Sequence, residues 1–280
     1  MKLGQKIAIA YIRTRLALLS VFSKKKAAQR TYELFCTPLK KVRQPLSPLF
    51  EQAEPCSITV KGITIKGFRW NKGGHTRVQL VHGFESASQN FEVYIRAFID
   101  KGYEVLAFDA PAHGVSGGLQ ITLALYIDAI RAVYQAYGPV QSFLAHSFGG
   151  LALVHFLETL PAESSFRLAL VAPATEAVTA IDNFFTLLQL DGEVRTAFDA
   201  IVRSKDNVDP SHFSIPRAIA HIHYPVLWVH DKNDTVTPLA DVQPVIDKQY
   251  PDVHFFITEG FGHRRIYREK SVVEAITAFL

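Results

Sequence analysis

The stretch Gln141–Leu160 (QSFLAHSFGGLALVHFLETL) decides the fold, because it changes from an apolar run to a helical pattern across one serine. Residues 141–146 are short and apolar, which is typical of a buried strand, and residues 148–160 have helical spacing. The junction Ala145-His-Ser-Phe-Gly-Gly150 follows the pattern G-x-S-x-G, with alanine at its first position. Ser147 is therefore expected on a sharp strand-to-helix turn, which needs small neighbours and exposes the hydroxyl. A serine before two glycines is also compatible with tight strand–helix packing, so the pentapeptide needs support from the rest of the chain.

The alternation of short apolar runs with longer helical patterns continues on both sides of this stretch. Residues 57–70 alternate apolar and polar side chains around Gly62, which predicts a β-hairpin. Continuous apolar strands separated by helices are typical of a parallel sheet covered on both faces. The sequence therefore predicts the α/β class, with a mostly parallel, doubly wound sheet. Strands are expected at 77–82, 103–108, 141–146, 166–171, 225–230 and 254–258, and helices at 90–101, 123–137, 148–160, 239–249 and 269–280.

The alternation pauses between residues 175 and 217, which have helical patterns and no intervening strand. This insertion carries closely spaced apolar residues, namely Phe184, Phe185, Leu187, Leu188 and Leu190. Functional groups of parallel-sheet enzymes gather at the carboxyl ends of the strands, so an insertion at that edge is expected to form a helical cap. An ordinary pair of surface helices is the alternative. The domain prediction is an arm and linker at 1–50, a core at 51–174 and 218–280, and a cap at 175–217.

The charge of the chain is unevenly distributed along its 280 residues. Residues 1–43 contain eleven Lys/Arg and one acid, Glu33, whereas the remainder contains 19 Lys/Arg and 25 Asp/Glu. The N-terminal arm is thus near +10 and the body near −6. The isoelectric point of about 9.0 is a property of the arm and says little about a catalytic site.

The arm is expected to be helical, because Ile9, Ile12, Leu16 and Leu19 recur at spacings of three and four with basic residues between them. Arg13 and Arg15 interrupt the apolar run, which disfavours a membrane-spanning helix and a signal peptide. Two interpretations remain. The arm packs its apolar stripe on the acidic body, or it attaches reversibly to an anionic membrane surface. Nucleic-acid binding is not favoured, because no recognised binding motif accompanies the charge.

The composition predicts a folded protein of the cytoplasm. Hydrophobic residues make up 48% of the chain and charged residues 20%, which is enough for a sizeable core. Cys36 and Cys56 are too few for a disulfide framework and are expected to be reduced structural thiols. The expected localisation is therefore cytoplasmic, with peripheral contact at the inner face of the membrane if the arm binds lipid.

Polar residues that could serve Ser147 follow three other predicted strands. His82-Gly83-Phe84 ends one strand, and the backbone N–H groups of Phe84 and Phe148 could donate to an oxyanion. Asp231 and Asp234 both follow a second strand, and His263 follows the last one. The order serine, acid, histidine is that of a hydrolase triad, in which the histidine activates the serine and the carboxylate orients the histidine.

Together these residues resemble the α/β-hydrolase superfamily over about residues 57–280. Asp109-Ala-Pro-Ala-His-Gly-Val-Ser116 adds to the likeness, because it is similar to the D-x-P-G-x-G-x-S turn of the family, with Ala112 replacing the usual glycine. More narrowly, the chain looks like the bacterial members with a helical lid between the sixth and seventh core strands. The resemblance implies that Asp234 is the acid of the triad and that Asp231 is a turn residue that accepts local N–H bonds.

The remaining histidines and arginines have less specific patterns. His82 and His113 stand at carboxyl ends of strands and, with Phe184, are expected to line a pocket, whereas His146 is expected to pack behind Ser147. His221 and His223 form an H-x-H pair without a visible third ligand, so no metal site is predicted. Arg264 and Arg265 follow the histidine of the triad. They are expected to pair with acids of the body rather than to bind an anionic substrate group.

The predicted function is that of a serine hydrolase that cleaves an ester or thioester of a small or medium apolar acyl group without metal or organic cofactor. A serine at position 147 disfavours the dehalogenase and epoxide-hydrolase branches, which need a carboxylate nucleophile there. Carbon–carbon bond hydrolysis and acyl transfer use the same triad and remain alternatives. The other class of function is a non-catalytic binding protein on a hydrolase scaffold.

Overall fold

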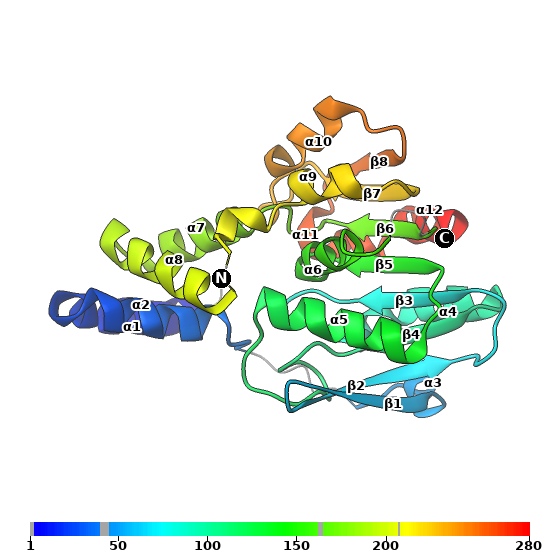
Figure 1. Cartoon of the computed structure of the whole chain (residues 1–280), viewed down its shortest axis with the longest axis horizontal. Coiled ribbons are helices and arrows are strands. Elements are labelled where there is room, and N and C mark those ends of the chain that lie inside the picture. Colours follow the sequence, from blue (N-terminus) through cyan, green and yellow to red (C-terminus); the bar gives the residue numbers. More distant parts are fainter. Residues whose placement is uncertain (1–2, 40–44, 162–164, 207) are drawn as a thin grey trace. The chain divides into compact units, whose positions relative to one another are not determined.

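The computed structural model describes residues 3–39, 45–161, 165–206 and 208–280 (Figure 1). The chain forms two compact units. One unit comprises Met1–Thr37 and Glu176–Ser214, and the other comprises Pro38–Thr175 and Ile215–Leu280. The basic arm therefore belongs with the inserted helices, although the sequence suggested a division into arm, core and cap. Among the described residues, none of the helices is both long enough and apolar enough to cross a membrane.

The larger unit contains an eight-stranded sheet with the order β1-β2-β4-β3-β5-β6-β7-β8. Strand β2 is antiparallel to both β1 and β4, and the other neighbours are parallel. The prediction of a mostly parallel α/β sheet is confirmed. The strands are β1 Glu54–Val60, β2 Ile63–Trp70, β3 Arg77–Val81, β4 Glu104–Phe108, β5 Ser142–His146, β6 Arg167–Val171, β7 Val226–Asp231 and β8 Val253–Thr258.

The predicted hairpin is formed by β1 and β2 and starts three residues earlier than expected. Val60 pairs with Ile63 across a two-residue turn, in which Lys61 and Gly62 both have positive φ. Pro55 is the second residue of β1. A proline is tolerated there because β1 is an edge strand and one of its sides needs no backbone donor.

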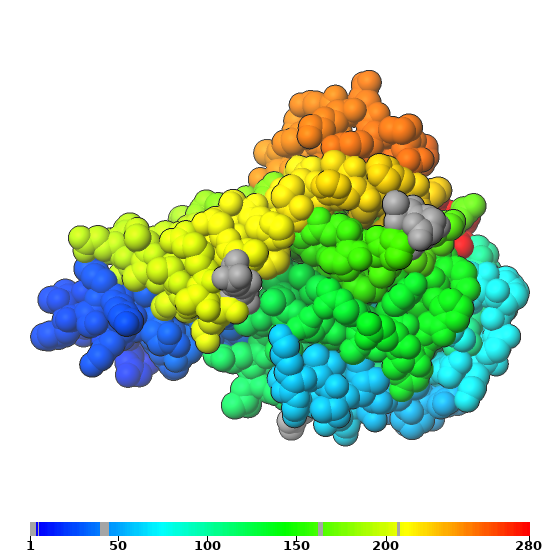
Figure 2. Space-filling view, viewed as in Figure 1, coloured from blue at the N-terminus to red at the C-terminus, as the bar shows by residue number. Residues whose placement is uncertain are grey.

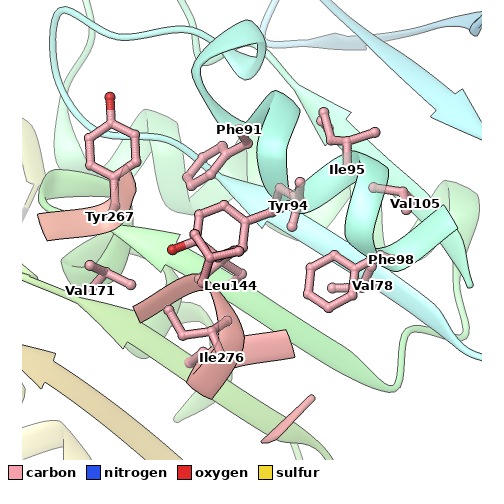
Figure 3. Packing of buried hydrophobic residues seen from close by; sticks show 14 of the residues in the cluster. Val78, Phe91, Tyr94, Ile95, Phe98, Val105, Leu144, Val171, Tyr267 and Ile276 are labelled. Atoms are coloured by element: carbon pink, nitrogen blue, oxygen red, sulfur yellow. The ribbon is translucent and has the colours of Figure 1, made fainter. Parts of the chain in front are cut away.

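Two pairs of helices cover the faces of the sheet. Helices α4 (Glu92–Asp100) and α12 (Lys270–Phe279) contribute to an apolar cluster that contains Tyr94, Phe98 and Ile276 together with Leu144 of β5 (Figure 3). Helices α5 (Leu123–Tyr137) and α6 (Phe148–Leu157) contact each other, and the ring of Tyr134 lies 6.3 Å from that of Phe143. Neighbouring strand residues point to opposite faces of the sheet. Leu144 therefore packs with the α4 and α12 layer, and Phe143 packs with the α5 and α6 layer.

Several helices are shorter than the sequence predicts. Helix α6 ends at Leu157 rather than Leu160, and the region 239–249 is a 3-10 turn followed by a short helix that contains Pro244. The proline has no N–H to donate, so it stands in the first turn of that helix. The short elements of the larger unit are α3 Pro48–Glu51, η1 Ser88–Phe91, α9 Ile215–Ala218, η3 Ile219–His221, η4 Leu239–Asp241, α10 Gln243–Lys248, α11 Gly262–Arg265 and η5 Ile266–Arg268.

The smaller unit joins the arm to the insertion that lies between β6 and β7 (Figures 1 and 2). Its helices are α1 Leu3–Phe22, α2 Lys24–Phe35, α7 Ala177–Leu188 and α8 Gly192–Asp206, with the turn η2 Pro210–His212. Ser23 ends α1 and caps α2 by accepting from the N–H of Lys26. Figure 1 shows the blue α1 and α2 beside the yellow-green α7 and α8.

The core of this unit is built mainly by α2, α7 and α8. Phe198 of α8 is fully buried, and its ring lies 5.2 Å from that of Phe185 and 5.7 Å from that of Phe35. Leu16 of α1 is buried as the helical spacing predicted. Charges add to the packing, because Lys24 pairs with Asp191 at 2.5 Å and with Glu193 at 3.3 Å.

Candidate active site

Ser147 stands at the junction of β5 and α6, as the sequence predicted. Its φ of 55° and ψ of −127° are strained for a residue with a side chain. The strain is held by the fold, because the N–H of Ser147 donates to Val171 O at 3.1 Å and Ala174 N donates to Ser147 O at 3.0 Å. The serine is thus fixed at the carboxyl end of the central strand, with its side chain partly exposed.

Glycines let three backbone segments meet at this turn. A Cβ on Gly149 would lie 2.5 Å from His82 O, and one on Gly150 would lie 2.7 Å from Pro173 Cβ. A Cβ on Gly83 would lie 2.9 Å from the Cβ of Ser147. Glycine is therefore required at these positions by close approach of the backbone, and the end of β3 is brought directly against the serine.

A continuous chain of hydrogen bonds links Ser147 to a carboxylate. His263 Nε2 lies 2.9 Å from Ser147 Oγ, and His263 Nδ1 lies 2.8 Å from Asp234 Oδ2. Ser147 lies at the β5–α6 junction, His263 lies in the short helix α11 after β8, and Asp234 lies in the loop after β7. Asp234 can hold the imidazole with its proton on Nδ1, which leaves Nε2 to accept the proton of the serine.

The environment of Asp234 keeps this carboxyl ionised. Burial acts to raise its pKa, but the hydrogen bond and charge of His263 and the N–H groups of Thr237 and Val236 outweigh burial, so the pKa lies below its usual value. Those N–H groups donate to Asp234 Oδ1 at 2.9 and 2.8 Å. Thr237 Oγ1 also donates to Asp234 Oδ2 at 2.8 Å. The sequence analysis did not identify Thr237, for which the pattern D-x-x-D-x-x-x-P contains no signal.

Asp231, at the end of β7, has a different role. It is fully buried and accepts from Asn233 N at 2.9 Å, from Thr258 Oγ1 at 2.7 Å and from Phe261 N at 3.1 Å. It thereby joins the end of β7 to the segment between β8 and α11, the short helix that carries His263. Of the two acids considered, the structure brings Asp234 to His263, whereas Asp231 is the last residue of β7 and accepts from the turn that follows it.

Phe148 directly follows Ser147 in the sequence, and Phe84 lies on the segment after β3 that meets the serine at Gly83. Phe148 is the first residue of α6, so its N–H is among those that have no acceptor within the helix. Phe84 follows Gly83, which adjoins the serine, and the two phenylalanine rings meet edge to face at 6.1 Å. Both backbone N–H groups are thus candidate donors to an oxyanion.

His82 and His113, expected to line a pocket, are almost fully buried supports of the loops beside Ser147. His82 Nδ1 donates to Gly83 O at 2.8 Å, and its Nε2 accepts from Ala110 N at 2.9 Å. His113 Nε2 accepts from Glu85 N at 3.0 Å. Because both rings are occupied by backbone groups, they shape the loops rather than offer a nitrogen to a substrate.

Two further buried histidines support the triad from behind. His146 donates from Nε2 to His263 O at 3.2 Å, and burial and the neighbouring His263 lower its pKa to about 3. The expectation that it packs behind Ser147 is thus met. His230, which the sequence analysis did not single out, donates from Nε2 to Thr237 O at 2.8 Å and has a pKa lowered mainly by burial.

The remaining residues singled out in the sequence are not members of this hydrogen-bond chain. Phe184 belongs to the smaller unit, where its ring meets that of Phe35 at 5.2 Å, so its assignment to a substrate pocket stays a prediction. His221 and His223 are exposed, as is Arg264. Arg265 pairs with Glu269 at 3.5 Å, in line with the expectation of an ion pair on the body.

His155 on α6 and Glu158 directly after this helix form a cluster of possible metal ligands. His155 Nδ1 lies 2.6 Å from Glu158 Oε1, and Arg217 Nη2 lies 2.7 Å from the same oxygen. Burial opposes the ionised form, but His155 and Arg217 lower the pKa of Glu158 to about 2. A guanidinium on the carboxylate occupies the place of a cation, so we interpret this cluster as an ion-pair network.

Comparisons with known proteins show which families and folds this chain is similar to. Residues 74–209 match the family model described as serine aminopeptidase, S33. The structure is similar to esterase PF2001 from Pyrococcus furiosus, with a TM-score of 0.66 and 18% identity over 88% of this chain and 97% of that chain. It is also similar to α/β-hydrolase domain-containing protein 10 from mouse, with a TM-score of 0.62 and 18% identity over 81% and 96%.

A thioesterase domain from the curacin biosynthetic pathway is similar as well, with a TM-score of 0.59 and 16% identity over 81% of this chain and 97% of that chain. No curated protein matches the chain at a significant level. At these identities, the likeness to the solved structures shows a shared fold.

Proposed function

We propose that this chain, a member of the α/β-hydrolase superfamily, is a serine hydrolase that cleaves an ester or thioester of a small or medium apolar acyl group. The observation that carries the proposal is the hydrogen-bond chain from Ser147 Oγ through His263 to Asp234, with lengths of 2.9 and 2.8 Å. Such a chain activates a hydroxyl that is otherwise a weak nucleophile.

In the proposed reaction, Ser147 Oγ attacks the acyl carbonyl carbon while His263 Nε2 takes its proton. The imidazolium that forms is stabilised by Asp234, and the oxyanion accepts from the N–H groups of Phe84 and Phe148. His263 then returns the proton to the leaving alcohol or thiol, and an acyl-enzyme forms on Ser147. Water, deprotonated by the same imidazole, attacks this ester and releases the acid.

The preference for an apolar acyl group is supported by the aromatic residues beside Ser147. Phe84 and Phe148 form an edge-to-face pair, and Phe84 remains 38% exposed. The inserted helices give less support than the sequence suggested, because Phe185 is buried in the smaller unit's own core. We therefore assign the acyl preference to the phenylalanine pair.

A fluorophosphonate probe tests the nucleophile directly. We expect the wild-type protein to be labelled and Ser147→Ala to be unlabelled. Ser204→Ala is the matched control, because Ser204 is exposed on α8 and donates only to the nearby Ile201 carbonyl at 2.8 Å. A folded wild-type protein that takes up no label would contradict the proposal and favour a binding protein on a hydrolase scaffold.

A panel of p-nitrophenyl esters and thioesters of graded acyl length then tests the substrate class. We expect the highest kcat/KM for acyl chains that can contact the phenylalanine pair, and a loss for Phe84→Ala that grows with chain length. The panel also includes an aminoacyl anilide, which has an amide bond, because residues 74–209 match the serine aminopeptidase family model. Faster cleavage of that amide than of every ester would replace the proposed substrate class by peptides.

A further inference from the structure

Helix α1 has two apolar faces, and only one of them is used in packing. Leu16 is buried, and Ile9, Ile12 and Leu19 are partly buried on the same side. The sequence analysis expected the opposite side to be basic. It instead carries large apolar side chains that are 59–85% exposed, namely Ile7, Tyr11, Leu18, Val21 and Phe22, which we call the outer stripe.

The outer stripe follows from helix geometry. At about 3.6 residues per turn, positions 7, 11, 18 and 22 fall on one side of a helix, about half a turn from position 16. A helix that is apolar on all sides is normally buried or in contact with lipid. α1 has apolar residues on two opposite sides, with exposed charges such as Lys6 and Arg15 between them. The side that does not pack within the protein is thus unusually apolar for a helix surface in water, and we expect it to contact a partner.

The charge around the stripe selects the kind of partner. The described part of α1 contains no acid, and Lys6 and Arg15 are exposed on it. Arg15 lies over the Tyr11 ring at 5.7 Å, an arrangement that keeps a cation next to an amphipathic aromatic. Lys25 and Lys26 continue the exposed positive charge at the start of α2.

Five described acids of the insertion form ion pairs with residues other than Lys6, Arg15, Lys25 and Lys26. Asp182 and Asp199 pair with Arg195, and Asp209 pairs with Arg203. Asp191 and Glu193 pair with Lys24. These pairs leave the charges of Lys6, Arg15, Lys25 and Lys26 available to a negative partner from outside the chain. A second copy of the arm would bring two segments near +10 together, which opposes self-association.

We propose that the outer stripe of α1 inserts into the interface of an anionic lipid bilayer and holds the hydrolase at a membrane surface. In this arrangement the stripe enters the boundary between headgroups and acyl chains, with the helix parallel to the surface. Lys6, Arg15, Lys25 and Lys26 contact the lipid phosphates, and Tyr11 lies at headgroup depth. Leu16 and its neighbours stay packed within the protein, so binding requires no unfolding of the arm.

The test is flotation of the full-length protein with vesicles of phosphatidylcholine alone, or with about one third phosphatidylglycerol. We expect binding to the anionic vesicles, weakened by salt, and little binding to the neutral ones. The double variant Leu18→Asp/Phe22→Asp should lower the partition coefficient at least about tenfold, because two large apolar anchors are lost. The variant Lys25→Glu/Lys26→Glu should lower it on anionic vesicles only.

Matched controls separate lipid binding from folding and from other partners. Leu119→Asp removes an equally exposed apolar side chain elsewhere and should leave binding unchanged. Every variant should keep the circular dichroism and fluorophosphonate labelling of the wild type. The proposal is overturned if the protein does not bind vesicles, or if it binds neutral and anionic vesicles equally. It is also overturned if the wild type is a dimer in solution and Leu18→Asp/Phe22→Asp converts it to a monomer. It is also overturned if Leu119→Asp weakens binding as much as the stripe variant does.

Discussion

At the scale of single residues, Asp231 and Asp234 show how two carboxylates three residues apart have different roles. The carboxylate of Asp234 contacts the imidazole of His263 and can stabilise the positive charge that forms on this ring during a reaction. That of Asp231 faces two N–H groups and a hydroxyl, which keep the same polarity throughout. The sequence left both open until the resemblance to a family was considered, because a spacing of three residues does not say which side chain meets His263.

Substitution of each acid by asparagine separates these tasks. Asp234→Asn should lower the rates of fluorophosphonate labelling and ester hydrolysis on the order of 10⁴-fold with little loss of stability, because the wrong tautomer of His263 is favoured. Asp231→Asn should keep much of the rate but lower the free energy of unfolding by about 1–3 kcal/mol, because its amide cannot accept from Thr258 and Phe261. The reverse assignment of rate loss and stability loss would contradict our interpretation.

The buried histidines give the protein a characteristic dependence on pH. The pKa of His146 is lowered to about 3, so the folded protein keeps this ring neutral while the unfolded chain protonates it below about 6.5. The stability that it contributes is present above pH 6.5 and is lost progressively as pH falls towards 3. His82 and His230 act in the same direction, because burial lowers the pKa of each.

Urea unfolding at pH 7, 6 and 5 measures this effect. The free energy of unfolding should fall below pH 6.5 with a slope of up to about 1.4 kcal/mol per pH unit for each such histidine. His146→Gln should reduce the slope by about one proton while keeping a side chain that can donate to His263 O. The lowered pKa values of Asp231 and Asp234 act at lower pH, below their ordinary range, so the two effects are separable. An unchanged slope in His146→Gln would exclude this ring as a cause.

At the scale of elements, the strand-to-helix turn depends on space that the pentapeptide alone does not reveal. Gly149 meets the carbonyl of His82, and Gly150 meets the side chain of Pro173. Ala145, the departure from the usual motif, is fully buried in β5 between Val81 and Leu170, so its methyl group fits the sheet rather than the reactive face. Ala112 has a φ of +65°, which explains why related turns use glycine at this position.

The substitution Gly149→Ala tests this packing. Its Cβ would lie 2.5 Å from a backbone carbonyl, so we expect a loss of about 1–3 kcal/mol in stability and a large loss of labelling rate. Gly192→Ala is the matched control, because it also lies in a helix but has no atom within 4 Å of the added Cβ. The control should be neutral or stabilising, as alanine favours helix. Equal effects of both substitutions would indicate a backbone effect rather than a collision.

At the scale of the whole molecule, the arm and the insertion fold together although about 140 residues separate them in the chain. The joint core of Phe198, Phe185 and the residues of α2 makes the smaller unit a long-range structure. The triad belongs to the larger unit alone. Damage to the first core should therefore be felt locally before it reaches Ser147.

Phe198→Ala tests that independence by hydrogen exchange. Removal of this fully buried ring should cost about 3–5 kcal/mol and should increase amide exchange in α2, α7 and α8. Exchange in β5 and α6 and labelling of Ser147 should change much less. Val93→Ala, a change at an exposed position of α4, is the control. Loss of protection in β5 to the same extent would show that the two units unfold as one.

The sequence by itself determined the order of strands and helices, the turn at Ser147 and the positions of His263 and the two candidate acids. These features depend on periodicity and on turn chemistry, which are local properties of the chain. Only the tertiary structure decided that Asp234 meets His263, that His82 and His113 support loops, and that Phe185 faces α2. It also decided that α1 has an apolar outer stripe, because the face that a helix buries depends on partners far away in the sequence. Contacts of that kind are set by three-dimensional packing, and a linear pattern does not encode their partners.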